Sequence, residues 1–205
     1  VIPSKAAQWA GIVILTLSVV LLYLRLGGWE DVNIARALSD VERAQPADII
    51  ALISRIETRA EARPANADYA LLLGEYYLSG NDPAAAFEYF DRLVVMGATA
   101  PEILGKAAQA EFLANDRQLS ATARVRAEQA LAVNTAEPAA LATLGMAAFE
   151  EADFRAAVKY WERLQALEPP GSPGYTMLAQ IIERARVALG EAPSLLADDS
   201  PEAPS

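Results

Sequence analysis

The side chains that most often carry out chemistry in proteins are absent from this sequence or lack a recognisable setting. The 205 residues include no cysteine and no histidine. These absences remove thiolate nucleophiles, disulfides and the side chain best suited to proton transfer near neutral pH and to metal ligation. For carboxylate pairs such as Glu150–Glu151, the sequence shows no buried pocket or cationic partner that would shift their pKa values toward those of an acid–base catalyst. We predict that the chain is not an enzyme and has no catalytic residues, no metal site and no cofactor.

One aromatic pair, Tyr160–Trp161, is the remaining candidate for a ligand site, since an aromatic face can stack on a bound group. The pair lies in DFRAAVKYWERLQALEPPGS, residues 153–172, where apolar side chains recur at helical spacing until two prolines end the pattern. Two interpretations follow: the rings line a binding site, or they pack one helix against its neighbour. The spacing favours packing.

Helices must position these side chains, because apolar residues recur every three to four positions over most of the chain. Pro, Gly and Asn separate the segments, and no stretch after the N-terminal apolar run alternates as a strand would. The sequence therefore predicts an all-α fold. The predicted helices cover residues 32–44, 47–62, 67–79, 83–96, 101–114, 120–133, 138–151, 154–167 and 173–189.

The helices form a repeat. LGEYYLSGNDPAAAFEYF, from Leu73, aligns with LGMAAFEEADFRAAVKYW, from Leu144, and a middle unit fits with three extra residues near NDRQLS. The shared positions are Gly74, Ala108 and Gly145 on the first helices, Ala86, Ala123 and Ala157 on the second, and the aromatic residues Phe90 and Trp161. This is the tetratricopeptide pattern, in which small residues let paired helices approach closely and successive hairpins stack into a superhelix. Ala70 and Glu111 replace its usual Trp and Tyr.

The first helices of stacked hairpins line a concave groove. Several positions predicted to face this groove are large apolar residues that the hairpin core does not require, which suits an amphipathic partner helix with basic flanks. The alternative is that neighbouring helices, including 173–189, bury them. The predicted groove residues are Leu71, Glu75, Leu78, Gln109, Phe112, Leu113, Met146, Phe149 and Glu150.

The N-terminal run AAQWAGIVILTLSVVLLYL, residues 6–24, contains no charged residue. At 1.5 Å per residue it would span roughly 28 Å, close to the hydrocarbon thickness of a bilayer. We predict a transmembrane helix over about 6–26, with the lipid bilayer as its partner. A signal peptide is the alternative, but its apolar core would be shorter and a small-residue cleavage motif would follow. The flanking charges are too few to fix the orientation.

Four segments follow from these patterns. We expect a membrane anchor over 1–29, a connecting helix or linker over 30–46, a tetratricopeptide-repeat domain over 47–190 and a disordered acidic tail over 191–205. The repeat domain would comprise a half-repeat, three repeats and a C-terminal covering helix. The net charge is −10, and residues 30–205 carry 27 acids against 15 bases. Such a body repels phosphate backbones, so nucleic acid is not an expected partner.

Three stretches resemble a known family. LGMAAFEEADFRAAVKYWERLQALEPPGS is similar to the last repeat of the bacterial cytochrome c maturation proteins of the CcmI (CycH) family. ALLLGEYYLSGND is similar to the first repeat of that family and of NrfG. LSATARVRAEQALAVNTAEPAALATLG resembles the segment that carries their irregular middle repeat. The similarity covers about residues 45–190.

The resemblance implies an apocytochrome c chaperone in the bacterial inner membrane, single-pass in this chain, with the repeats in the periplasm. Such a protein holds the C-terminal helix of apocytochrome c and delivers it to haem lyase subunits of the CcmF/CcmH type. A scaffold that tethers these subunits without contacting the client is the alternative. Family members usually have two membrane helices, so this chain corresponds either to the second helix with the periplasmic domain or to a shorter NrfG-like form. The family defines no catalytic residues.

Overall fold

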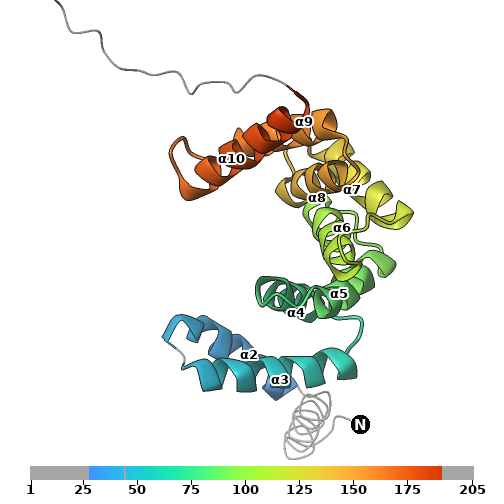
Figure 1. Cartoon of the computed structure of the whole chain (residues 1–205). Coiled ribbons are helices and arrows are strands. Elements are labelled where there is room, and N and C mark those ends of the chain that lie inside the picture. Colours follow the sequence, from blue (N-terminus) through green and yellow to red (C-terminus); the bar gives the residue numbers. More distant parts are fainter. Residues whose placement is uncertain (1–27, 44, 191–205) are drawn as a thin grey trace, which may run out of the picture. The chain divides into compact units, whose positions relative to one another are not determined.

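The computed structural model describes residues 28–43 and 45–190, so the predicted membrane helix and acidic tail lie outside the described residues. Within these ranges the structure is all-α, with nine α-helices and one short 3₁₀-helix (Figure 1). No helix in this part of the chain is both long and apolar enough to span a bilayer. The elements are α2 (Gly28–Ser39), η1 (Val41–Arg43), α3 (Pro46–Ala62), α4 (Ala67–Ser79), α5 (Pro83–Val95), α6 (Pro101–Ala114), α7 (Ala121–Val133), α8 (Pro138–Glu150), α9 (Phe154–Gln165) and α10 (Pro173–Ala188).

Helix starts follow from local chemistry. Proline occupies an early position of α3, α5, α6, α8 and α10, where its missing N–H leaves no helical hydrogen bond unmade. Asp82 and Asp153 each accept a hydrogen bond from a backbone N–H inside the helix that follows, both at 3.1 Å. The residue before each cap, Asn81 or Ala152, has a positive φ of 61° or 59°. The first and third hairpins therefore turn in the same way, as their aligned sequences predict.

The first predicted helix differs from the observed one. We expected a helix over 32–44, but α2 begins at Gly28 and ends at Ser39. Glu30 and Asp31 lie in its first turn, where carboxylates favour a helix start. The chain then changes to the 3₁₀-helix η1.

The chain divides into two compact units between Arg63 and Pro64. In the first unit, α2 and α3 are joined by ion pairs. Glu30 pairs with Arg55 at 2.7 Å, and Asp31 pairs with Arg59 at 2.6 Å and with Arg63 at 2.5 Å.

In the described residues of the second unit, α4–α5, α6–α7 and α8–α9 form three helical hairpins, and α10 packs on α9. Each outer hairpin has a ring over a glycine: a Cβ built on Gly74 would lie 3.0 Å from Cζ of Phe90, and one on Gly145 only 2.4 Å from Nε1 of Trp161. Trp161 is 5% exposed. The packing interpretation of Trp161 is therefore confirmed.

The middle hairpin packs through small side chains instead. Ala108 of α6 and Ala123 and Ala127 of α7 are fully buried in one cluster, which also includes Leu104 and Leu144. Ala127 stands where the other hairpins have Phe90 and Trp161. The predicted repeat register is therefore confirmed in the middle unit, although no aromatic ring fills its gap.

Candidate peptide-binding groove

The first helices of the hairpins, α4, α6 and α8, carry all the predicted groove residues. Two ion pairs connect successive first helices. Lys106 of α6 binds the carboxylate of Glu75 on α4. Arg117, just after α6, lies with a guanidinium nitrogen 3.6 Å from a carboxylate oxygen of Glu150 on α8. Both predicted groove acids thus have a basic partner on the neighbouring hairpin.

The apolar groove residues of the first two hairpins differ in accessibility. Leu71 on α4 is 38% exposed, whereas Phe112 on α6 is 1% exposed and belongs to the core. Leu78, Gln109 and Leu113 are half-buried. Phe112 therefore supports α6 from within, and Leu71, Leu78 and Leu113 are the apolar positions that retain accessible surface.

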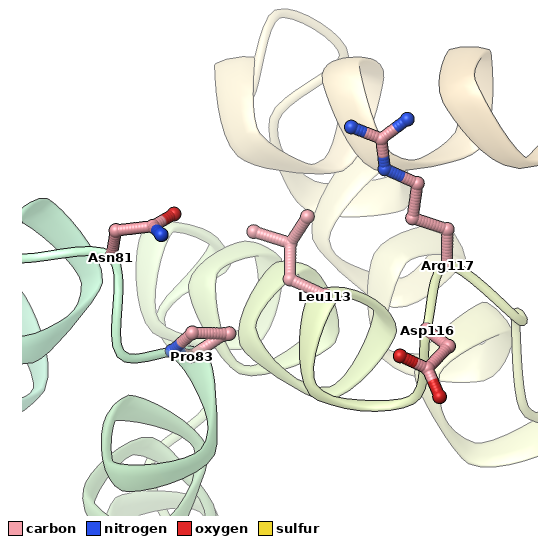
Figure 2. Close-up of a pocket in the computed structure, with 5 residues that line it drawn as sticks. All are labelled: Asn81, Pro83, Leu113, Asp116 and Arg117. Atoms are coloured by element: carbon pink, nitrogen blue, oxygen red, sulfur yellow. The ribbon is translucent and has the colours of Figure 1, made fainter.

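A pocket of about 390 Å³ forms where the first two hairpins meet, with Leu113 in its lining (Figure 2). Asn81, from the turn between α4 and α5, and Pro83, the first residue of α5, line one side, and Asp116 and Arg117 line it from the loop after α6. Asp116 and Arg117 have positive φ values of 49° and 61°, which carry the chain back toward α7. Of these lining residues we predicted only Leu113. The signal that could have identified Asp116 and Arg117 is the three-residue insertion of the middle repeat, which falls in this loop.

In the third hairpin, two of the three predicted groove residues contact a hydrophobic cluster. Met146 and Phe149 are half-buried against a cluster that includes Trp161, Leu178 and Ile182. The ring of Phe149 lies 5.6 Å from that of Trp161 and 5.2 Å from that of Phe154. Both rings that Phe149 contacts belong to α9, the second helix of the same hairpin, so Phe149 contributes to the packing of its own hairpin.

A charged network connects the middle hairpin to α5. The side chain of Arg126 on α7 is only 12% exposed and binds Asp91 of α5 at 2.5 Å and Glu111 of α6 at 3.1 Å. Its guanidinium lies 5.9 Å from the centre of the Phe87 ring, within the range of a cation–π contact. Ser120 donates a hydrogen bond to the other oxygen of Glu111 at 2.5 Å. Arg126 therefore joins three helices, and Glu111, which replaces the usual Tyr of the repeat, is its partner on α6.

Glu137 is the most deeply buried carboxylate among the described residues. It is 2% exposed, and it accepts backbone hydrogen bonds from Ala139 at 3.3 Å and Ala140 at 2.6 Å at the start of α8. A Cβ on Gly105 would lie 2.0 Å from its Oε2, so the glycine makes the space for it. Burial raises the pKa of Glu137 above its usual 4.5, and the two backbone N–H groups and Lys106 only partly offset this.

This raised pKa predicts a pH-dependent stability. Glu137 binds a proton more tightly in the folded state than in the unfolded chain. Its contribution to the free energy of unfolding is therefore favourable at low pH, and it is lost as the pH rises from 4.5 through the pKa of the folded state. Relative to Glu137→Gln, the wild type should gain stability as the pH falls from about 7 toward 4.5. Urea denaturation of both proteins across this range tests it, with the exposed Glu128→Gln on α7 as control. The prediction is contradicted if the free energy of unfolding changes with pH in the same way for the wild type and for Glu137→Gln.

No cluster of three or more potential metal-ligating side chains occurs in residues 28–43 and 45–190. The helices α4 and α6 carry accessible apolar side chains together with charged ones, which suits the binding of a polypeptide segment.

The sequence of this chain is similar to a described protein family and to known bacterial proteins. Residues 34–175 match the family described as cytochrome c-type biogenesis protein H TPR domain. The chain is 32% identical over 171 residues to the cytochrome c-type biogenesis protein CycH of Pseudomonas aeruginosa, which covers 83% of this chain and 41% of that protein. It is 26% identical over 120 residues to the formate-dependent nitrite reductase complex subunit NrfG of Escherichia coli O157:H7, covering 58% of this chain and 61% of that one. The chain thus spans less than two thirds of either relative.

Solved structures show the same fold. Two crystal structures of MamA superpose with TM-scores of 0.63 and 0.57. The first is 22% identical and covers 80% of this chain and 84% of that chain; the second is 24% identical and covers 70% and 80%. At this level of identity the likeness extends to the fold alone.

Proposed function

Because the chain belongs to the family of the cytochrome c-type biogenesis protein H TPR domain, we propose that it acts in the maturation of c-type cytochromes as a membrane-anchored periplasmic chaperone. It binds the C-terminal helix of apocytochrome c and delivers it to haem lyase subunits of the CcmF/CcmH type. The observation that carries this proposal is the family match over residues 34–175, which covers α4 to α9 in full.

Accessible apolar surface on the first helices supports the binding of a helix. Leu71, Leu78 and Leu113 retain exposed surface along α4 and α6, and Leu113 borders the pocket beside the α4–α5 turn. An amphipathic helix binds through anchors spaced at i, i+3 or i+4 and i+7, each in an apolar depression. We therefore place the client on the first two hairpins, away from the third hairpin, whose Met146 and Phe149 pack against the hydrophobic cluster around Trp161.

Composition supports the same partner. The acidic chain would attract a client with basic flanks and accelerate its encounter in a salt-dependent manner. Haem attachment requires free thiols on the client, and a chaperone without cysteine forms no mixed disulfide with them. The uncharged run at residues 6–24 supports an anchor in the bacterial inner membrane.

The test is a binding titration of the full chain in detergent with a fluorescent peptide from the C-terminal helix of an apocytochrome c. Replacing both Leu71 and Leu113 by alanine should raise Kd about tenfold or more, because truncating two apolar anchors removes at least about 1.4 kcal/mol. The matched control replaces the exposed Val95 and Val133, 77% and 71% exposed on α5 and α7, by alanine. Melting followed by circular dichroism confirms that each variant is folded.

Equal affinity of both double variants would contradict the placement of the client on α4 and α6. The scaffold function predicts a different outcome: the peptide fails to bind the wild type, while haem lyase subunits still co-purify with it. That pair of results would replace the chaperone function by the scaffold function.

A further inference from the structure

The helix α2 has two chemically distinct faces. Its inner face includes Ile34, which is 1% exposed, and the half-buried Leu38. The acids of its first turn also lie toward α3. Glu30 accepts two hydrogen bonds from Arg55 at 2.7 and 2.8 Å. Asp31 pairs with Arg59 of α3 and with Arg63, the residue after α3. Both carboxylates of α2, Glu30 and Asp31, are therefore paired with arginines of α3.

The outer face of α2 is apolar and basic. Trp29 and Val32 are 56% and 41% exposed, and Arg36 follows them at the i, i+3, i+7 spacing of one helical face. Among the described residues of α2, no acidic side chain lies on this face, although the chain carries a net charge of −10. The hydroxyl of Ser39, also on this side, donates a hydrogen bond to the carbonyl oxygen of Arg36 at 2.6 Å.

The position of α2 in the sequence indicates what this face contacts. The uncharged run ends at residue 24, Arg25 follows, and Trp29 comes four residues later. A chain that leaves a bilayer after this run is at the lipid headgroups when α2 begins. Tryptophan is enriched at that depth, and a helix with one apolar and basic face lies in the interface with its cations near lipid phosphates.

We propose that α2 lies on the surface of the bilayer in which the chain is anchored, through the face formed by Trp29, Val32 and Arg36. The arginines of α3 keep Glu30 and Asp31 away from the anionic headgroups, so the two functions of the helix, docking on α3 and on lipid, are divided between its faces. This inference rests on the membrane anchor of the proposed function. It adds a second membrane contact, which restrains the first unit against the bilayer rather than leaving it on a free tether.

The absence of cysteine makes a direct test possible, since one introduced cysteine gives one labelled site. Val32→Cys carries a nitroxide, and the full chain is reconstituted into vesicles of phosphatidylethanolamine and phosphatidylglycerol. Collision with a water-soluble nickel complex should be about threefold lower, and collision with oxygen higher, than for the control Val95→Cys in the second unit. Ser54→Cys, exposed on α3, is the control within the first unit.

Flotation of the vesicles after an alkaline wash measures the anchor separately. If the protein floats but the label at position 32 is as accessible to nickel as the label at position 95, the surface helix is wrong while the anchor stands. If the protein does not float, the anchor is wrong and the inference fails with it. Protection that disappears when the protein is diluted into excess lipid indicates that a second copy covers α2, which also overturns the inference.

Discussion

Replacing Gly145 by alanine lowers the free energy of unfolding by about 2–3 kcal/mol, because the new methyl group overpacks a closed core. The added Cβ would lie 2.4 Å from Nε1 and 2.6 Å from Cδ1 of Trp161, both far inside van der Waals contact. The indole has little room to retreat, since it is 5% exposed and packs against the Phe149 ring at 5.6 Å. Urea denaturation followed by circular dichroism at 222 nm measures the change.

Two further sets of variants test whether contact with the Trp161 indole causes this loss of stability. Gly74→Ala places its Cβ 3.0 Å from the edge of the Phe90 ring, so a smaller loss of about 1 kcal/mol is expected there. Trp161→Phe recreates the first hairpin's pair in the third, and Gly145→Ala should then destabilise this background less than it does the wild type. If Gly145→Ala has the same effect in both backgrounds, contact with the indole is not the reason for the loss.

Replacing Arg126 by methionine should lower stability by about 2–3 kcal/mol, because it leaves Glu111 and Asp91 without the cation that binds them. The estimate lies below the range for fully buried pairs because Asp91 is 35% exposed, while Glu111 is 15% exposed. Methionine keeps most of the side-chain volume over Phe87, so the loss reports on charge more than on packing. Thermal unfolding at low and high salt measures it.

The same helix provides the control. Arg124 pairs with Glu151 at 2.7 Å, but its side chain is 43% exposed, so Arg124→Met should change stability by only about 0.5 kcal/mol or less. Adding Glu111→Gln to Arg126→Met should recover part of the loss, since the uncompensated charge is then removed. Equal effects of the two arginine replacements would show that the network contributes no more than a surface pair.

Periodicity and small residues predicted the helices and their pairing because these depend on local chemistry. Gly74, Gly145 and their opposing rings were identified from spacing alone, and the structure confirms the contacts. Accessibility was harder to predict, because it depends on which neighbouring helix covers a face. Phe112 is buried and Phe149 packs against the rings of Phe154 and Trp161 on α9, although helical phase placed both in the groove.

The middle repeat shows a second limit of sequence reasoning. Glu111 looked like a weak match to the pattern, yet it is the partner of Arg126, fifteen positions later in the chain. Glu137 gave no signal of burial, because a carboxylate before a proline is ordinary at a helix start. Its position depends on Gly105 in the preceding hairpin. Both cases are compensations between distant residues, which a repeat pattern does not encode.

The packing of α10 on α9 sets a length scale for the ligand. By burying Leu178, Ile182 and Ala185 in one cluster with Trp161, α10 covers the face of α9 on which a fourth hairpin would stack. Among the hairpins that the structure describes, the proposed client site can then extend over three first helices at most. At roughly 8–10 Å between neighbouring helices, this is about 16–20 Å, or 11–13 residues of a bound helix. We therefore expect the proposed site to hold at most about three turns of a client helix, whatever the length of the rest of the client.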